Sequence, residues 1–476
     1  MSNALLSQNG MTFLGLYLLS LIGIGIYGLV KSKENTMSDF YLGGAGFGVT
    51  ILFLTMYATQ YSGNSLIGFA GSAYRNGWFF LVSFTFMIAI VGGYMLYAPK
   101  LYALSQKHKF ITIGDYIRHR YRHKLLTNII VFVGIMALSN YMLTNLKAIG
   151  YILNYVTGGY VGFAEGIIAM AIIMVIYETL GGMRSVAWTD AIQGILLLFG
   201  VLIIFGVIWV HYGSISSNEA LLLQVKSEFF KEPLLADKIK WLSILIMIFF
   251  GISVYPQAIQ RIYAAKNSQT LKRSFQLMII MPILTTLPLI VIAIIGAAHF
   301  PELDKTSSEQ IILLMLSKLT HIDGMSFVIT LFIAAAIAAI MSTVDSAMLA
   351  IASLFTQDIY HQSNPDASQK KLTLVGKLFS WILMAIMVYL AISLPSTIWW
   401  LIQIKLELLC QIAPAVMLGV HFKNISSRSI LLGLLTGLGF TLLFLLTDLP
   451  NKPFGFHAGV IGLGLNFLVI YFHHKK

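Results

Sequence analysis

The chain has 476 residues, of which 58% are hydrophobic and only 11% are charged, and its mean hydropathy is +0.82. Soluble domains carry about 25% charged residues, so this composition excludes an ordinary soluble protein and indicates an all-α polytopic membrane protein. The single cysteine, Cys410, excludes a disulfide framework and a cysteine-based metal cluster. The net charge of +12 requires no nucleic-acid partner, because membrane proteins retain Lys and Arg on their cytoplasmic side.

Apolar runs of about 20 residues, each long enough to cross a lipid bilayer as a helix, follow one another along the chain. We count about thirteen, at residues 11–30, 46–73, 78–101, 124–156, 160–180, 186–212, 238–262, 270–298, 324–358, 372–394, 396–420, 427–447 and 455–473. The first run does not resemble a cleaved signal peptide, because no basic residue precedes it and no cleavage motif separates it from Lys31 and Lys33. We expect it to be retained as a helix.

The basic residues indicate the orientation of the chain in the membrane. An N-terminus outside the membrane places most of the 31 Lys and Arg residues in inner segments, including the basic stretch 107–124 and Arg261. The outer loops then hold Glu219, Glu228, Glu232, Glu302, Asp304 and Glu309. This bias follows the positive-inside rule and predicts a multi-pass protein of the plasma (inner) membrane with a cytoplasmic C-terminus. Residues 107–123 are predicted to form an amphipathic helix on the inner membrane surface.

Two of the apolar runs are interrupted by residues that disfavour a continuous helix. In ATQYSGNSLIGFAG, residues 58–71, polar side chains and three glycines weaken the helix in mid-span. In FFGISVYPQAIQR, residues 249–261, Pro256 removes a backbone hydrogen bond. Carbonyls freed at membrane depth need a cavity or a cation. We therefore predict a broken helix at each place; the alternatives are a glycine-packed helix and a plain proline kink.

The stretch AAIAAIMSTVDSAMLA, residues 335–350, places a carboxylate and hydroxyls in an apolar helix. Its Ala339, Ser342, Thr343, Asp345 and Ser346 share one side of that helix. A charge at the bilayer centre costs at least roughly 2.5–3.5 kcal/mol, and a hard cation bound by oxygen ligands would offset that cost. This pattern predicts half of an Na⁺ site, completed by carbonyls of a broken helix. The alternative is that the hydroxyls bond to their own helix and that Asp345 is protonated or paired with a base.

Other intramembrane polar residues have less distinct roles. In ETLGGMRSVAWTDAIQG, residues 178–194, Asp190 opens an apolar span and is either a functional carboxylate or a charge at a helix start. Lys147 lies near Asn145 and can extend outward to the interface. Lys405 and Glu407 are two residues apart and are therefore expected to point to different sides of a helix.

The order of the interrupted runs indicates an internal repeat. Each opens a block of five helices, at residues 46–212 and 238–420, and broken helices at corresponding positions of two halves are typical of a transporter with a midplane site. Because five is odd, the second block enters the membrane from the opposite side, so the repeats are inverted. Residues 1–45 then form an extra N-terminal helix with an inner loop, residues 213–237 an outer loop, and residues 421–476 two extra C-terminal helices.

Four motifs carry a resemblance to a known family. They are ATQYSGNSLIGFAGSAYRNGW, ETLGGMRSVAWTDAIQG, YPQAIQRIYAAKN and AAIMSTVDSAMLAIASLFTQDIY, in order across about residues 38–362. Here the chain resembles the sodium/solute symporter family, which includes carriers for proline, pantothenate, monocarboxylates, sialic acid and glucose or galactose. The resemblance implies a five-plus-five inverted-repeat fold like that of the leucine transporter, with about 13 transmembrane helices, and it implies Na⁺ as the coupling ion.

The resemblance also implies the residues of the cation sites. The ligands of the first Na⁺ would be the carbonyls of Ala58, Tyr61 and Ala339 with the hydroxyls of Ser342 and Thr343. Some members of the family hold a further Na⁺ nearer the cytoplasm, and the matching positions are Asp190, Ser342, Asp345 and Ser346. Two carboxylates sharing a buried pocket repel each other unless a cation or a proton lies between them. This second site is therefore expected to hold Na⁺ or H⁺.

The substrate contacts implied by the resemblance come from three segments. They are Gln60, Ser62, Asn64, Ser65, Tyr141, Asn145, Tyr255 and Gln257. Gln60 stands where the proline carriers have an acidic residue, and Asn64 stands where they have an aromatic residue. These departures disfavour proline and favour the monocarboxylate and pantothenate branch.

These observations together predict Na⁺-coupled import of a small organic solute by alternating access. A monomer is expected to suffice, with the lipid bilayer and the solute as its partners. The rivals are an H⁺-coupled carrier that uses Asp190 and Asp345, a channel, and a membrane sensor that has lost transport. A membrane enzyme is disfavoured, because His108, His119 and His123 have no acidic partner at the spacing of a zinc protease.

Overall fold

The structure is a computed structural model that describes residues 5–32, 36–394, 398–447, 449 and 452–474. Within these ranges it does not describe the side chains of residues 64, 306, 398–403 and 454. The described residues fold into helices, and the one extended pairing among them is an isolated parallel bridge between Phe47 and Ala265. The prediction of an all-α protein is confirmed.

Long helices separated by short helical turns make up the chain. Up to residue 212 these are α1 (Gln8–Val30), α2 (Met37–Leu42), α3 (Val49–Gln60), the π-helical turn η1 (Asn64–Gly68), α4 (Phe69–Asn76), η2 (Gly77–Ser83), α5 (Phe84–His108), α6 (Ile113–Tyr121), α7 (Lys124–Val156) and α8 (Phe163–Tyr212). The middle part comprises α9 (Ile215–Val225), η3 (Ser227–Phe230), α10 (Leu235–Gly251), η4 (Ile252–Val254), α11 (Pro256–Ala264), α12 (Ser268–Met281), η5 (Pro282–Thr286), α13 (Leu287–His299), α14 (Lys305–Ser308), α15 (Ile311–Ser317), α16 (Met325–Leu354), η6 (Phe355–Tyr360) and α17 (His361–Ser363). The last part comprises α18 (Gln369–Ser393), α19 (Ile398–Leu409), η7 (Cys410–Ile412), α20 (Ala413–His421), α21 (Ser427–Leu446), η8 (Pro453–Gly455) and α22 (Ala458–His474).

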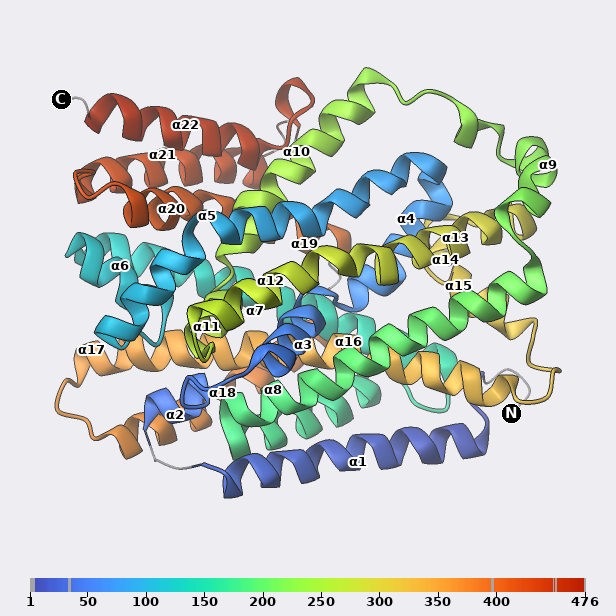
Figure 1. The fold of residues 1–476 in the computed structure, drawn as a ribbon, viewed down its shortest axis with the longest axis horizontal. Helices are drawn as coiled ribbons and strands as arrows, with labels where there is room; N and C mark the ends of the chain where they lie inside the picture. The colour runs from blue at the N-terminus through green and yellow to red at the C-terminus, as the bar shows by residue number, and fades with distance from the viewer. Residues whose placement is uncertain (1–4, 33–35, 395–397, 448, 450–451, 475–476) are drawn as a thin grey trace.

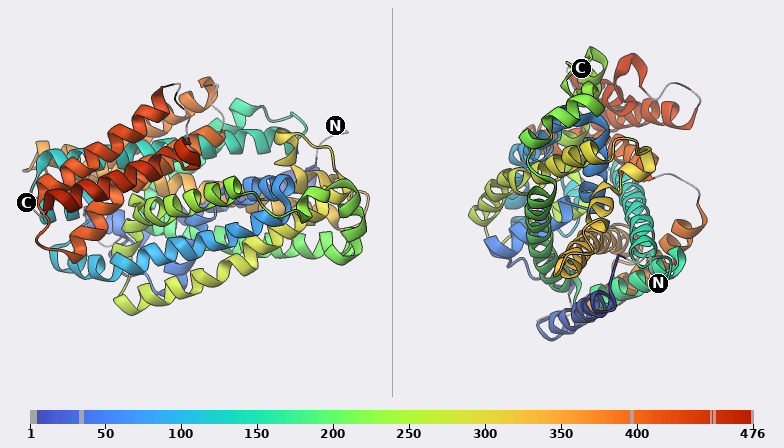
Figure 2. Two further views of the ribbon diagram at one scale, coloured as in Figure 1. Left: turned by 90° about the horizontal axis from the view of Figure 1, so that it is seen from above. Right: turned by 90° about the vertical axis from the view of Figure 1, so that its right-hand side faces the viewer.

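The long helices run roughly parallel to one axis of an elongated bundle (Figures 1 and 2). The short helices α9, α14 and α15, from the loops predicted to be outside, gather at one end, whereas α6 and α17, from segments predicted to be inside, lie at the other (Figure 1). Helix α1 starts at the α9 end and α22 finishes at the α6 end, as expected for an odd number of crossings (Figure 1).

The number of membrane spans is only partly settled by helix length. Among the described residues, nine helices are long and apolar enough to cross a membrane, and ten if the bent pair Leu235–Val254 and Pro256–Ala264 counts as one span. Two shorter apolar helices, α3 and α22, fall below that length. The runs predicted at 160–180 and 186–212 correspond to the two parts of α8, which are two helices that meet at a kink at Gly182, where φ is 55° and ψ is −141°. The count of thirteen therefore stays a prediction.

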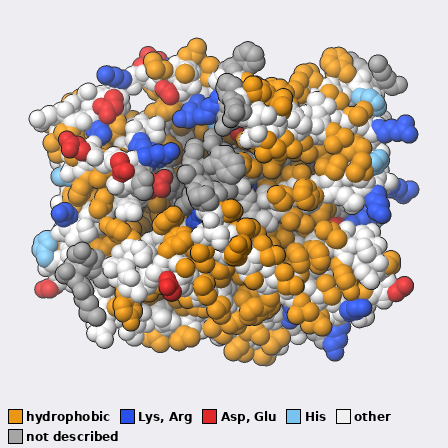
Figure 3. Space-filling model, turned by 180° about the vertical axis from the view of Figure 1, so that it is seen from behind, with side chains coloured by type: hydrophobic (Ala, Val, Ile, Leu, Met, Phe, Trp, Pro, Cys, Tyr) orange, Lys and Arg blue, Asp and Glu red, His pale blue; other side chains and the backbone are white. Residues whose placement is uncertain are grey.

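Helix α16 forms the centre of the bundle, and α1 lies at its edge. In the most apolar 18-residue segment of Met325–Ser363, which includes α16, 83% of the residues are buried. In the corresponding segment of α1 only 22% are buried. Large apolar side chains such as Leu16, Leu19 and Phe132 remain exposed, and hydrophobic side chains cover much of one face (Figure 3). Such a surface suits contact with lipid, whereas polar groups on α16 must find their partners inside the protein.

Candidate functional site

The predicted break in the first interrupted run is confirmed. Helix α3 ends at Gln60, Tyr61 has ψ of 87°, and the chain resumes as the π-helical turn η1. A helix leaves its last carbonyls without intrahelical partners, so this break exposes oxygen atoms inside the bundle. Gly63 lets the break lie against α16, because a Cβ added there would be 2.1 Å from Cγ1 of Ile340.

The second predicted break is also confirmed. Helix α10 continues through η4 to Val254, and α11 begins at Pro256, with a bend of 50° between the two parts. Tyr255, with ψ of 131°, occupies the junction. Proline at the first position of a helix loses nothing by lacking an N–H group, which explains why α11 starts there.

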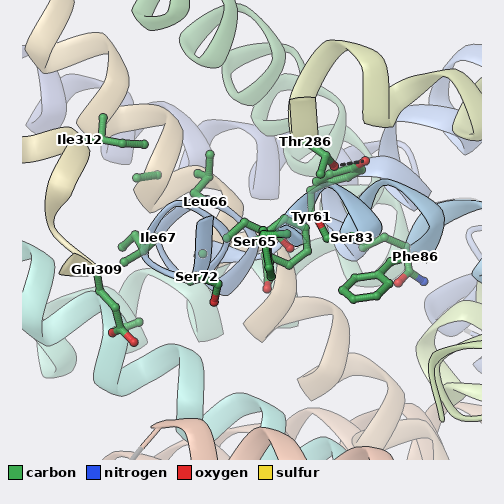
Figure 4. A pocket seen from close by; sticks show the side chains of 18 of the residues that line it. Tyr61, Ser65, Leu66, Ile67, Ser72, Ser83, Phe86, Thr286, Glu309 and Ile312 are labelled. Carbon is green, nitrogen blue, oxygen red and sulfur yellow. Dashed lines mark hydrogen bonds between the residues drawn. The ribbon is translucent and has the colours of Figure 1, made fainter. Parts of the chain in front are cut away.

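The break in α3 and the polar side of α16 meet through hydroxyl and carbonyl oxygens. Ser342 Oγ donates to the Ala58 carbonyl at 2.8 Å, whereas Thr343 Oγ1 donates to the carbonyl of Ala339, one turn earlier in its own helix, at 3.0 Å. All four residues are fully buried. The structure thus brings together four of the five residues predicted to hold Na⁺. The fifth, Tyr61, is also buried, and its phenol pairs with Thr286 Oγ1 at 3.2 Å (Figure 4).

This oxygen set suits a hard monovalent cation. Carbonyls and hydroxyls are ligands that hard cations prefer, and no group of three or more His, Cys, Asp or Glu side chains in the described ranges is arranged to hold a metal ion. Both hydroxyls now donate hydrogen bonds to carbonyls. A bound Na⁺ would need those same oxygens as electron-pair donors, so it would replace the Ser342–Ala58 hydrogen bond with coordination by both atoms.

The second predicted pocket contains a base that the sequence placed elsewhere. Arg261 was counted among the residues of the inner segments, but its side chain is only 1% exposed. Its guanidinium pairs with Asp190 Oδ2 at 2.7 Å and donates to Thr55 Oγ1 at 2.9 Å and to Ser346 Oγ. The assignment of Arg261 to an inner segment is corrected: the bend at Pro256 carries α11 into the core, where a guanidinium needs a carboxylate partner.

Asp345 has its own partners in this pocket. The Tyr177 hydroxyl donates to Asp345 Oδ2, and the Ser346 backbone N–H donates to Oδ1 at 2.8 Å. Both carboxylate oxygens therefore accept hydrogen bonds. Asp190 Oδ1, by contrast, is buried without a hydrogen-bond partner in the part of the chain that the structure describes. The predicted pair of carboxylates thus lies within a network that already contains one positive charge.

A cavity of about 640 Å³ opens beside the break in α3. Among the residues predicted to contact substrate, those that line it are Gln60, Ser62, Ser65, Tyr141 and Tyr255. Figure 4 shows Ser65 and Tyr61 on this wall, with Phe86, Ser72 and Ile312 around them. The volume is typical of a small-molecule site.

Two predicted substrate residues lie outside the cavity lining, and one is not described. Asn145 is buried and donates to the Tyr141 carbonyl of its own helix at 2.8 Å. Gln257 is buried, and neither of its amide atoms has a partner among the described residues. The side chain of Asn64 lies outside the described part of the structure. Of the eight residues predicted to contact the substrate, five therefore line the cavity.

Tyr141 connects the cavity with the predicted Na⁺ site. It lines the cavity, and its hydroxyl lies beside those of Ser62 and Thr343. Its ring meets the ring of Tyr255 edge to face, with centroids 5.9 Å apart. One aromatic side chain on α7 thus touches α16 and both broken segments.

Charged residues line the cavity toward its α14 end. Arg75 Nη1 donates to Ser308 Oγ at 2.6 Å, and Lys305 and Glu309 complete this part of the wall. Burial raises the pKa of the Glu309 carboxyl above its ordinary value, while the positive charges of Arg75 and Lys305 oppose that rise. Glu309 projects at the edge of the cavity in Figure 4.

The structure also shows site residues for which the sequence offered no signal. The Gln60 amide donates to Tyr94 Oη at 2.7 Å, and Thr286 pairs with Tyr61. Tyr94 belongs to an apolar run in which nothing marks it as polar.

Lys405 lines the cavity, whereas Glu407 on the same helix faces His457 at 3.2 Å. The prediction that these two residues point to different sides is confirmed.

We expect Gly63→Ala to separate α3 from α16. Alanine accepts the backbone angles at Gly63, with φ of −53° and ψ of −32°, so the effect is purely steric and comes from Ile340. Overpacking of this kind costs about 1–3 kcal/mol. The variant should melt at lower temperature and need more Na⁺ for the same thermal stabilisation, as scanning fluorimetry of the purified protein will show.

A second substitution distinguishes this contact from a general loss of glycine. Ile340→Ala in the Gly63→Ala background removes the clashing Cγ1 and should restore part of the Na⁺ response. Gly48→Ala is the matched control, because a Cβ at Gly48 meets nothing within 4 Å. An unchanged Na⁺ response in Gly63→Ala alone would contradict the close approach.

Comparisons with known proteins agree with this architecture. The family model described as "Sodium:solute symporter family" matches residues 40–437. The sodium/pantothenate symporter of Haemophilus influenzae is 26% identical over 456 residues, covering 94% of this chain and 92% of that protein. The osmoregulated proline transporter OpuE of Bacillus subtilis is 26% identical over 452 residues, covering 92% and 89%.

A solved structure has the same fold. It is described as the substrate-bound outward-open state of a Na⁺-coupled sialic acid symporter, and it superposes with a TM-score of 0.81 at 18% identity, covering 98% of this chain and 97% of that one. The family match spans most of the chain, and the pantothenate and sialic acid symporters are by their names coupled to Na⁺. This chain belongs to the sodium:solute symporter family, whose coupling ion is Na⁺.

Proposed function

We propose that this protein imports a small organic solute together with Na⁺ by alternating access. The observation that carries the proposal is the hydrogen bond from Ser342 to the Ala58 carbonyl across the break in α3, next to a cavity of about 640 Å³. Oxygens from two separate helices meet there only while those helices stay together. A cation bound between them would therefore favour the state in which they are joined.

The proposed Na⁺ ligands are the carbonyls of Ala58, Tyr61 and Ala339 with the hydroxyls of Ser342 and Thr343. Inward opening would move α16 away from the end of α3 and disperse this set. Na⁺ would then bind one state more tightly than the other, and that difference in affinity is what coupling requires. Tyr141, in contact with both the cavity and Thr343, would transmit the ordering of one site to the other.

The proposed movement relates two halves of the chain, residues 46–212 and 238–420. We propose that these are inverted repeats, each opening with a broken helix, and that a monomer is sufficient for transport. In the proposed orientation the α9, α14 and α15 end of the bundle is outside, as the basic inner segments suggest. The charged cavity wall at Arg75, Lys305 and Glu309 would then face the outer side.

A single coupling Na⁺ is the simpler proposal for this chain. The Arg261 guanidinium already offsets one of the two carboxylates, that of Asp190, while Asp345 accepts from the Tyr177 hydroxyl and the Ser346 N–H, so the two carboxylates do not have to share a second Na⁺ or H⁺. The alternative, a second cation held by Asp190, Ser342, Asp345 and Ser346, rests on the unpartnered Asp190 Oδ1.

The solute is proposed to be a small carboxylate or an amino-acid-like compound. Relatives named for pantothenate, proline and sialic acid carry solutes that share a carboxyl group. In this chain the cavity would offer Gln60, Ser62, Ser65, Tyr141 and Tyr255 for contacts with the solute.

We expect purified protein in proteoliposomes to accumulate at least one solute in Na⁺ and none in K⁺. The panel is monocarboxylates, amino acids, sugars and vitamins, each with an inward gradient of either ion. Uptake driven by a pH gradient without Na⁺ would replace this proposal with H⁺ coupling. Na⁺-dependent binding without accumulation would identify a sensor instead.

A further inference from the structure

Lys405 places a positive charge in the cavity wall, where no carboxylate of the described residues pairs with it. Its side chain belongs to α19 and is 5% exposed. Its Nζ lies 3.5 Å from the centroid of the Tyr141 ring and 5.4 Å from that of Tyr255. Among the described residues no carboxylate forms an ion pair with Lys405. The neighbouring Glu407 is engaged elsewhere: it accepts from the Gly459 N–H at 3.1 Å and pairs with His457.

Two aromatic rings do not balance a buried ammonium. Contact with aromatic faces is worth about 0.5–2 kcal/mol, whereas a buried charge without a counter-ion costs several kcal/mol. Because this lysine faces a cavity large enough for a small molecule, its counter-ion can arrive with the solute. An anionic group there would be held by charge and by a hydrogen bond together.

Tyr255 supplies an independent observation at the same place. Its side chain is buried and lines the same cavity, yet its hydroxyl has no hydrogen-bond partner among the described residues. A buried hydroxyl without a partner is costly. An ammonium and a free hydroxyl on one wall form a pair of donors, which matches the two acceptor oxygens of a carboxylate.

We propose that Lys405 and Tyr255 bind the carboxylate of the transported solute, so that the cavity accepts organic anions and zwitterions and rejects cations. This inference rests on the proposed function and names the substrate class of its site. Gln60, Ser62 and Ser65 line the cavity from the α3–α4 segment and are left for the uncharged part of the solute. Tyr141 then lies between the carboxylate of the solute and the proposed Na⁺, since its ring contacts Lys405 and its hydroxyl lies beside Thr343.

The test compares acids with their uncharged analogues on the full-length protein in lipid nanodiscs. The probes are pantothenate and pantothenol, lactate and lactamide, proline and prolinamide, and N-acetylneuraminate and its methyl ester, each measured in Na⁺ by thermal shift and by competition. We expect one of the acids to bind in a Na⁺-dependent manner and its neutral or cationic analogue to bind at least 10-fold more weakly.

The variant Lys405→Met should weaken binding of that acid by about 10–100-fold, because a hydrogen bond to a charged group is lost. Lys405→Arg should retain most of the affinity, and Lys318→Met, at an exposed lysine outside the cavity, should bind as the wild type does. Stabilisation by Na⁺ alone should persist in Lys405→Met. This last measurement shows that the variant is folded and that its Na⁺ site is intact.

Three results of the binding test would overturn the inference. They are stronger binding of the amide or ester than of the acid, wild-type affinity for the acid in a folded Lys405→Met, and loss of binding in Lys405→Arg equal to that in Lys405→Met. The proposed function fails in a different way, by the absence of Na⁺-dependent uptake of every solute in the wild-type protein, and the inference falls with it. Na⁺-coupled uptake of a neutral sugar that is unaffected by Lys405→Met would overturn the inference and leave the proposed function standing.

Discussion

Replacing Ser342 by alanine is expected to raise the Na⁺ concentration for half-maximal uptake by about 10-fold or more. The Ser342 hydroxyl on α16 donates to the Ala58 carbonyl at the end of α3 at 2.8 Å. A polar contact to a charged partner is worth about 1.5–3 kcal/mol, and each 1.4 kcal/mol is a factor of about ten. Thr343→Val should act in the same direction. The measurement is the Na⁺ dependence of initial uptake in proteoliposomes.

The control for these variants is Thr330→Val on the same helix. Thr330 is buried and its hydroxyl donates to the Ser326 carbonyl at 2.8 Å, so the change has the same chemistry away from the break. It should leave the Na⁺ dependence unchanged. If Ser342→Ala and Thr343→Val keep the wild-type Na⁺ dependence, the site has been placed wrongly.

Replacing Arg261 by glutamine is expected to destabilise the folded protein by about 3–5 kcal/mol. The guanidinium is the buried partner of Asp190, and removing one member of a buried ion pair leaves the other charge uncompensated. The double variant Arg261→Gln with Asp190→Asn removes both charges and should recover part of the loss. Hydrogen bonds from Arg261 to Thr55 and to the Gln257 carbonyl remain absent, so recovery is incomplete. Thermal unfolding of the purified protein in detergent will rank the variants.

An exposed ion pair of equal length provides the comparison. Lys238 and Glu232 are also 2.7 Å apart, but both are exposed. Lys238→Gln should change stability by no more than about 1 kcal/mol, because water screens an exposed pair. If Arg261→Gln melts at the wild-type temperature, or if the double variant is no more stable than the single one, the Arg261–Asp190 pair does not hold the core together.

The break at residues 58–65 and the bend at Pro256 were predictable because their causes are local. Glycines and polar side chains weaken a helix wherever they occur, and proline disrupts the residues beside it in any fold. The kink in α8 lies between two runs that were also predicted as separate spans, but its position depends on more than the local sequence. At Gly182 φ is 55°, and the carbonyl of Phe40 lies 2.4 Å from an ideal Cβ. That close approach comes from another segment of the chain.

The polar residues of α16 could be singled out from the sequence more easily than the residues around them. Ser342, Thr343 and Asp345 stood out because polar groups in an apolar helix are costly. The partners of Gln60 and Tyr61 did not stand out. Tyr94 and Thr286 are unremarkable in their own runs, and the five predicted substrate residues that line the cavity could not be told in advance from Asn145 and Gln257, which do not line it.

The amino-acid sequence alone determined that this is a helical membrane protein of the symporter family, with two broken helices and with hydroxyls and a carboxylate on one side of α16. Those conclusions follow from hydropathy, helix-breaking residues and motif order, which are local properties of the chain. Only the tertiary structure decided which charge meets which partner. Arg261 and Asp190 are 71 residues apart and Tyr177 and Asp345 are 168 apart, and Lys405 meets Tyr141 and Tyr255 only because three helices pack around one cavity. The energy of a buried charge depends on the groups that folding brings around it. A local sequence pattern does not identify those groups, because they come from distant parts of the chain.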